Sequence, residues 1–178
     1  MANSSGKYGL KPIGKEVRPP EMFNISPTTS IMGYGDVVEI VASNGVALAV
    51  AGNEDNAGVC IGVVDADGIP VSYYPGGTPS NDTYKALVIT DPQQRYAVKC
   101  SGALSSVDVG GTADLVLGDA STYTGISASY ITTVSTGDAN LKILGLLETQ
   151  GNAWGANQDV VVVIHEHSLS GSTITQGV

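Results

Sequence analysis

Short apolar runs separated by turn-forming residues fill the chain from residue 36 onward. Two such runs, residues 36–43 and 46–51, flank Asn44-Gly45, the dipeptide that most favours a type I′ hairpin turn. Further runs rich in β-branched residues cover 57–64, 84–90, 94–100, 141–148 and 159–166. No longer stretch keeps a helical period of about 3.6 residues. The pattern predicts an all-β fold, a compact antiparallel β-barrel or sandwich of roughly eight or nine short strands.

Residues 94–100 show the clearest alternation of side-chain character. Successive side chains of a strand point to opposite faces, so one set should be buried and the other solvated. The set expected inside is Tyr96, Val98 and Cys100, and the set expected outside is Arg95, Ala97 and Lys99. Residues 118–137 are rich in Ser and Thr, which is typical of an edge strand or a surface loop. A short helical turn is compatible with residues 103–107.

Proline and glycine interrupt the chain before Asp36 so often that no helix can persist there. We therefore predict an extended N-terminal arm over residues 1–35, a β domain over residues 36–169 and a flexible C-terminal tail over residues 170–178. Roughly twenty extended residues, at about 3.3 Å each, span about 65 Å, enough to cross to a neighbour. A disordered tail is the alternative, although its regularly placed apolar side chains count against it.

Charge is divided unevenly between the two ends of the chain. The first 20 residues hold four bases and one acid, a formal charge of +3, whereas the rest holds four bases and 16 acids, −12, giving the net −9. This division favours an arm that binds another acidic surface, either a partner protein or a second copy. Duplex DNA typically needs about six to ten phosphate contacts, so we expect no nucleic-acid partner.

Composition also bears on location and redox state. No window approaches the ~18 apolar residues of a membrane span, and the N-terminus lacks the apolar core of a secretion signal. We therefore expect synthesis in the cytoplasm and no membrane partner. Cys60 and Cys100 both fall in predicted strands, where they are either reduced core thiols or a single disulfide.

Candidate chemistry is sparse. His165 and His167 lie two residues apart on a predicted strand, but a zinc site needs at least a third protein ligand, which the sequence does not identify. Residues 65–68, Asp-Ala-Asp-Gly, begin like a calcium loop but lack its downstream oxygen ligands, so we interpret them as a turn. No nucleophile elbow, phosphate loop or dinucleotide motif occurs. The sequence predicts a protein that is not an enzyme and needs no cofactor.

Several weak motifs occur in a consistent order along most of the chain. They are Gly-Leu-Lys-Pro within Ser4–Ile13, Gly35-Asp36-x-Val38, Gly62-Val63-Val64, Tyr73-Tyr74-Pro75, Val88 with Asp91-Pro92 and Tyr96, Leu141–Leu146, Asn152 with Gly155, Val160–Ile164 and His167-Ser168-Leu169. Together they resemble a family of tailed-phage virion proteins, the capsid decoration or cement proteins. The chain departs from the family pattern between Met22 and Met32 and after Leu169.

The resemblance implies a non-enzymatic virion protein on the outer capsid surface. Such a protein would bridge adjacent major capsid proteins as a homo-oligomer, with a trimer favoured and a dimer possible. We hypothesise that the arm binds the capsid through apolar anchors and steering cations. The residues assigned to it are Lys7, Tyr8, Leu10, Lys11, Pro12, Lys15 and Arg18. Removing residues 1–20 should then leave a folded body that no longer binds capsids.

An adhesin-like or carbohydrate-binding β-module on the virion surface is the alternative function. Aromatic side chains in turn-rich regions would supply a stacking platform for sugars. The candidates are Tyr73, Tyr74, Tyr123, Tyr130 and Trp154.

Overall fold

The computed structural model describes residue 3 and residues 5–14, 18–27, 29–41, 45–50, 55–77, 84–135, 139–165 and 167–169. Within these ranges the chain forms strands and turns with a single 3-10 helix, η1 (Ser106–Asp108), close to the helical turn expected at residues 103–107. The all-β prediction is confirmed. The predicted tail at residues 170–178 and Asn44 of the predicted hairpin turn lie outside the described residues.

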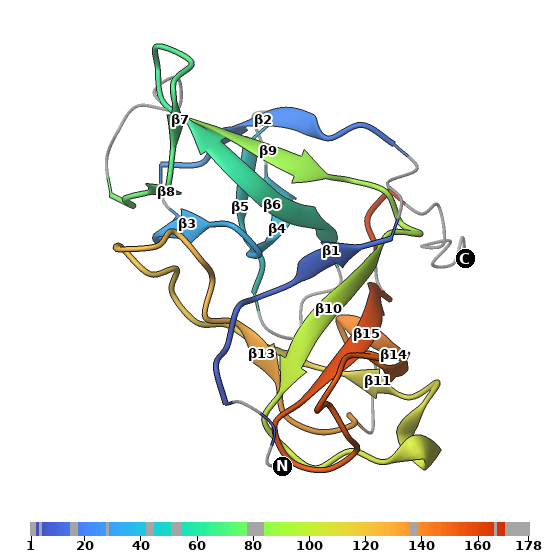
Figure 1. The fold of residues 1–178 in the computed structure, drawn as a ribbon. Helices are drawn as coiled ribbons and strands as arrows, with labels where there is room; N and C mark the ends of the chain where they lie inside the picture. The colour runs from blue at the N-terminus through green and yellow to red at the C-terminus, as the bar shows by residue number, and fades with distance from the viewer. Residues whose placement is uncertain are drawn as a thin grey trace, which may run out of the picture.

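Two small β-barrels make up the fold (Figure 1). The first closes because its strands follow the order β4-β5-β2-β9-β6 and β6 pairs back with β4. Its strands are β2 (Glu21–Ile25), β4 (Val37–Val41), β5 (Gly45–Leu48), β6 (Asn56–Val64) and β9 (Lys85–Ile89), and the short β7 (Pro70–Val71) extends it beside β6. Antiparallel pairs predominate, with β2 and β5 parallel. The hairpin partners expected on either side of Asn44-Gly45 are thus paired as β4 and β5.

The second barrel closes through residues 112–116, which form two consecutive short strands, β11 and β12. The first of these pairs with β14 and the second with β13, at the opposite ends of the strand order, so the sheet closes on itself. Its strands are β10 (Arg95–Cys100), β11 (Thr112–Ala113), β12 (Leu115–Val116), β13 (Tyr130–Ile131), β14 (Leu141–Leu146) and β15 (Gln158–Ile164). Apart from β13, residues 118–135 form loops, one of which bridges Ile126 to Tyr34 beside the small sheet of β3 (Met32–Gly33) and β8 (Tyr73–Tyr74).

Two strands of the first barrel are apolar on both faces, and one of these faces packs against the core of the second barrel. In β4 and β6, Val38 and Cys60 belong to the core of the first barrel, whereas Val37 and Val59 belong to that of the second. A strand buried on both sides appears in sequence as an unbroken apolar run rather than as an alternation. The barrel prediction is therefore confirmed, and the chain forms two barrels packed against each other where the sequence indicated one.

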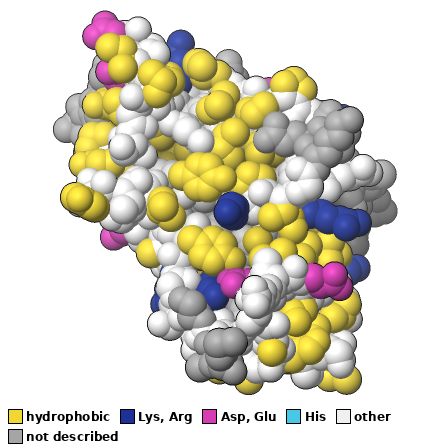
Figure 2. All heavy atoms as spheres, in the orientation of Figure 1, with side chains coloured by type: hydrophobic (Ala, Val, Ile, Leu, Met, Phe, Trp, Pro, Cys, Tyr) yellow, Lys and Arg dark blue, Asp and Glu magenta, His cyan; other side chains and the backbone are white. Residues whose placement is uncertain are grey.

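The described residues of the N-terminal region do not stand apart from the β domain. β1 (Lys11–Ile13) pairs antiparallel with β10, and β2 lies between β5 and β9 within the first barrel. The free arm expected over residues 1–35 is therefore corrected for these residues. Apolar side chains and open strand edges of the same chain can combine without the entropy cost of association. On the face that carries β1, hydrophobic side chains surround a Lys or Arg side chain (Figure 2).

Cys60 and Cys100 are free, buried thiols in different barrels, so of the two alternatives the structure has reduced core thiols. Burial raises the pKa of Cys60 to about 12 and that of Cys100 to about 11, which makes both poor nucleophiles. Nowhere in the described ranges does a helix have the length and apolar character to cross a membrane.

Candidate functional site

The N-terminal segment, defined here as residues 5–13, docks on the rest of its own chain through a close contact between two glycines, Gly9 and Gly35. The Leu10 amide donates to the carbonyl of Gly35 at 2.8 Å, and a Cβ on Gly9 would lie 2.4 Å from that oxygen. Gly9 has φ +67°, a conformation that glycine adopts without strain. Two motifs of the resemblance, Gly-Leu-Lys-Pro and Gly-Asp, therefore meet in space and fasten the segment to its own chain.

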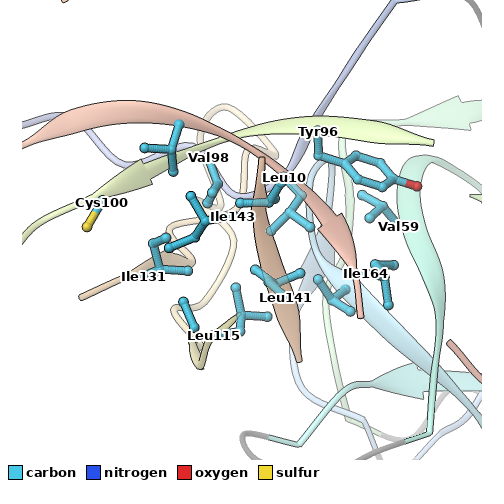
Figure 3. Packing of buried hydrophobic residues seen from close by; sticks show 14 of the residues in the cluster. Leu10, Val59, Tyr96, Val98, Cys100, Leu115, Ile131, Leu141, Ile143 and Ile164 are labelled. Carbon is cyan, nitrogen blue, oxygen red and sulfur yellow. The ribbon is translucent and has the colours of Figure 1, made fainter. Parts of the chain in front are cut away.

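Leu10 is the apolar anchor of this docking. Its side chain is fully buried in the core of the second barrel (Figure 3). In that view it lies among side chains that include Val98 and Ile143 of β10 and β14. The hypothesis that Leu10 anchors the arm in a capsid protein is therefore corrected, because this side chain already fills space inside its own molecule.

A buried ion pair holds the neighbouring residue Tyr8. The Tyr8 hydroxyl donates to Asp159 Oδ1 at 2.7 Å, and Lys99 Nζ lies 2.7 Å from the same oxygen. Burial raises the pKa of Tyr8, and the hydrogen bond to the Asp159 carboxylate raises it further. Only 3% of the Lys99 side chain is exposed.

The outer face of β10 is therefore covered where the sequence predicted solvent. Ala97 and Lys99 are buried and only Arg95 is exposed, so the alternation was interpreted correctly for one of the three residues. β1 lies along the strand edge with Lys11 opposite Ala97, and Tyr8 approaches Lys99 from the same segment. A segment distant in sequence supplies this cover, which local periodicity cannot register.

Of the other predicted site residues, those that the structure describes lie at or near the surface. Lys7 Nζ is 3.2 Å from the centre of the Tyr130 ring, a cation–π contact. Lys11 and Arg18 are exposed, and Pro12 is half-buried within β1. Lys15 lies outside the described residues. Five of the seven assigned residues thus lie along one docked segment, and Leu10 is the one that points into the core.

A hollow of about 650 Å³ opens beside this segment. Its walls come from the N-terminal segment, from the second barrel with its loops, and from Tyr34 beside β3, and they are mostly apolar, with Lys11 and Asp159 as the charged members. The lining residues are Tyr8, Lys11, Ile13, Tyr34, Ala97, Ile126, Leu147, Thr149 and Asp159. The sequence hypothesis included only Tyr8 and Lys11. The Ser- and Thr-rich composition of residues 118–137 gives no sign that the side chain of Ile126, 42% exposed, lines a hollow beside the N-terminal segment.

The two histidines differ in position from the sequence expectation and differ in burial from each other. β15 ends at Ile164, so both histidines follow the strand rather than lie on it. His165 is exposed, whereas His167 is buried and accepts a hydrogen bond from the Leu169 amide on Nδ1 at 3.1 Å. Desolvation lowers the pKa of His167. Across the described ranges, no group of three or more His, Cys, Asp or Glu side chains is placed to bind a metal.

The aromatic residues of the alternative function do not form one platform. Tyr74 is buried in the first barrel, edge-to-face with Tyr84 at 5.4 Å, whereas Trp154 packs against the core of the second. The Tyr130 ring is covered by the Lys7 ammonium. Tyr123 is 94% exposed in a loop. These positions favour structural roles over sugar stacking for Tyr74, Trp154 and Tyr130.

Asp36 is a buried carboxylate at the junction that receives the N-terminal segment. Its Oδ2 accepts the Gly33 amide at 2.8 Å. Burial raises the pKa of Asp36 to about 6, with hydrogen bonds from Ser127 and Gly33 opposing the shift and the charge of Asp119 adding to it. The folded state therefore holds this proton more tightly than the unfolded chain, whose carboxyl has its ordinary pKa of 3.8.

We expect the contribution of Asp36 to stability to be full below about pH 4 and to be lost as pH rises through about 6, a decline of roughly 2–3 kcal/mol. Asp36→Asn should remove this decline while keeping an oxygen acceptor for Gly33. Urea unfolding at several pH values from 4 to 8 measures it. Asp114→Asn, at an exposed position, controls for the loss of one negative charge. Parallel pH profiles for all three proteins would contradict the assignment.

Comparison of the chain with family models, with curated proteins and with solved structures found no match. The description of the molecule therefore rests on its sequence and fold. It is an all-β protein of two packed barrels, with a docked N-terminal segment beside an open, mostly apolar hollow.

Proposed function

We propose that this protein is a virion structural protein that decorates the outer surface of a phage capsid and stabilises it without catalysis. The observation that carries the proposal is the contact between the Gly9-Leu10 and Gly35-Asp36 elements. Motifs that resemble a family by chance have no reason to touch, whereas these two depend on each other sterically. The contact supports treating the resemblance as one of structure.

The capsid-binding surface in this proposal is the hollow and its rim. Detaching the N-terminal segment would withdraw Leu10 from the barrel core and break the Tyr8–Asp159 hydrogen bond. Both losses cost free energy, so we do not expect the segment to detach in order to bind a partner. The segment instead builds one wall of a rigid surface, with exposed Lys11 at its edge. The partner is the major capsid protein. In this proposal the capsid is bound by the hollow, and not by a free N-terminal arm as the sequence predicts.

Bridging requires more than one such surface. In a homo-oligomer, for which we favour a trimer over a dimer, the first docked subunit raises the effective concentration of the others at the lattice. Binding that selects the assembled lattice shifts the equilibrium toward it. Individually weak contacts at each hollow would then hold adjacent capsid proteins together.

Co-sedimentation with expanded capsids that lack the protein tests this function. Ile126→Asp places a charge in the hollow at a position exposed enough to tolerate it, and we expect capsid occupancy to fall at least about tenfold. Val107→Asp, at an 87% exposed position on η1, is the matched control and should bind like the parent.

The native mass of the free protein should be measured alongside the sedimentation. A parent protein that does not sediment with the capsids would refute decoration. Equal occupancy for the parent and both variants would refute the hollow as the contact surface.

A further inference from the structure

Of the two charged residues that line the hollow, one is paired with an opposite charge and, within the described chain, the other is not. Asp159 is already bound by Lys99 at 2.7 Å and by the Tyr8 hydroxyl at 2.7 Å. Lys11 is exposed and takes part in no ion pair with any residue that the structure describes. Within a protein of net charge −9, the hollow therefore presents uncompensated positive charge.

A second cation stands at the same face. Side chains two residues apart on a strand share a face, so Arg95 lies on the same side of β10 as the lining residue Ala97. Arg95 is exposed, and it pairs across the strands with Ile13, which also lines the hollow. The positive charge thus continues from Lys11 along the rim, where a carboxylate of another molecule would be attracted.

The walls beside these cations are apolar. Ile13, Tyr34, Ile126 and Leu147 come from four separate parts of the chain and converge on the hollow. Its volume of about 650 Å³ is within the usual range for sites that enclose a ligand of several side chains in size. An occupant that buries a large apolar group here, with an acid beside it, would satisfy both features.

Backbone pairing is a poor mode of binding at this place. β1 pairs with β10 on one side, and Pro12 in its centre has no N–H to donate on the other. Proline on an edge strand discourages the addition of a further strand. Recognition must therefore come from side chains rather than from extension of the sheet.

We infer that the hollow binds a protein segment in which a Glu or Asp side chain is adjacent to a large apolar side chain. Lys11 pairs with the carboxylate, Arg95 adds to the attraction, and the wall of Tyr34, Ile126 and Leu147 receives the apolar group. The identity of the partner as a capsid protein rests on the proposed function. The chemistry of the segment does not, because it follows from the charges and walls of the hollow.

The probe is acetyl-Ala-Glu-Phe-Ala-amide, compared with the same peptide carrying Gln in place of Glu, added to the full-length ¹⁵N-labelled protein. We expect amide shift changes centred on Tyr8, Lys11, Ile13, Tyr34 and Ile126. The Glu peptide should bind roughly two- to fivefold more tightly than the Gln peptide, as is usual for an exposed ion pair. Lys11→Gln, an exposed substitution, should keep the fold and reduce that difference, leaving only the weaker attraction of Arg95.

Three outcomes would overturn the inference: no shift changes up to the solubility limit of the peptide, changes centred elsewhere, or equal affinity for the two peptides in the parent protein. Failure of the proposed function gives a different result. If the parent does not sediment with capsids but the Lys11-dependent preference is seen, decoration is wrong and the chemistry of the hollow stands. If the protein sediments with capsids but shows no preference for the Glu peptide, decoration stands and the inferred chemistry of the hollow is wrong.

Discussion

Replacing Leu10 with Ala is expected to destabilise the protein by about 3 kcal/mol, within the usual range of roughly 2–5 for a buried Leu. The side chain is fully buried in the core of the second barrel, although it lies only a few residues from the N-terminus. The substitution removes apolar contacts and leaves a cavity that packed strands cannot fill. The midpoint of urea unfolding, monitored by circular dichroism, measures the loss.

Leu117→Ala is the matched control, because this leucine is 38% exposed and should change stability by no more than about 0.5 kcal/mol. A Leu10→Ala protein as stable as that control would show that the N-terminal segment is not packed against the barrel in solution. It would then support the free N-terminal arm that the sequence predicts. Removing residues 1–20 should be more damaging still, since it deletes Leu10 and β1 together. The sequence alone had led us to expect a folded body after that truncation.

The longer strands could be predicted because their signal is local. The apolar runs at residues 57–64, 84–90, 94–100, 141–148 and 159–166 became β6, β9, β10, β14 and β15 with ends shifted by a few residues. The division into two barrels could not be predicted in the same way. It depends on which core each face of β4 and β6 packs against. An apolar run indicates that a strand is buried, but it does not identify the elements that bury it.

The N-terminal segment was misinterpreted for a related reason. The four cations of residues 1–20 indicate a separate charged body, and the prolines there indicate extended chain. What fixes it in place are contacts with Gly35, Ser129 and Asp159, all distant in sequence. The sequence predicts only a small part of the candidate site: Tyr8 and Lys11 can be identified from the segment itself, whereas Tyr34, Ile126 and Leu147 join them only through the fold.

Asp159→Asn is expected to cost about 2–3 kcal/mol, because it leaves the buried Lys99 ammonium without its counter-charge. The partial exposure of Asp159, 23% of its side chain, keeps the figure at the low end for a broken buried pair. Lys99→Met should be nearly neutral, since Asp159 can reach solvent and still accepts the Tyr8 hydroxyl. Tyr8→Phe should cost about 1 kcal/mol through the lost hydrogen bond.

The double variant decides whether these residues act as a unit. If the cost of Asp159→Asn comes from stranding Lys99, then adding Lys99→Met should recover most of it, giving a coupling energy of about 2 kcal/mol in urea unfolding. Additive effects would mean that the Lys99–Asp159 pair does not form in solution. Hydrogen exchange gives a separate measure, because the β1 amides should lose protection in Asp159→Asn but keep it in Lys99→Met. Coupling together with that loss would show that the Asp159 carboxylate, through its contacts with Lys99 and Tyr8, keeps the N-terminal segment on the barrel.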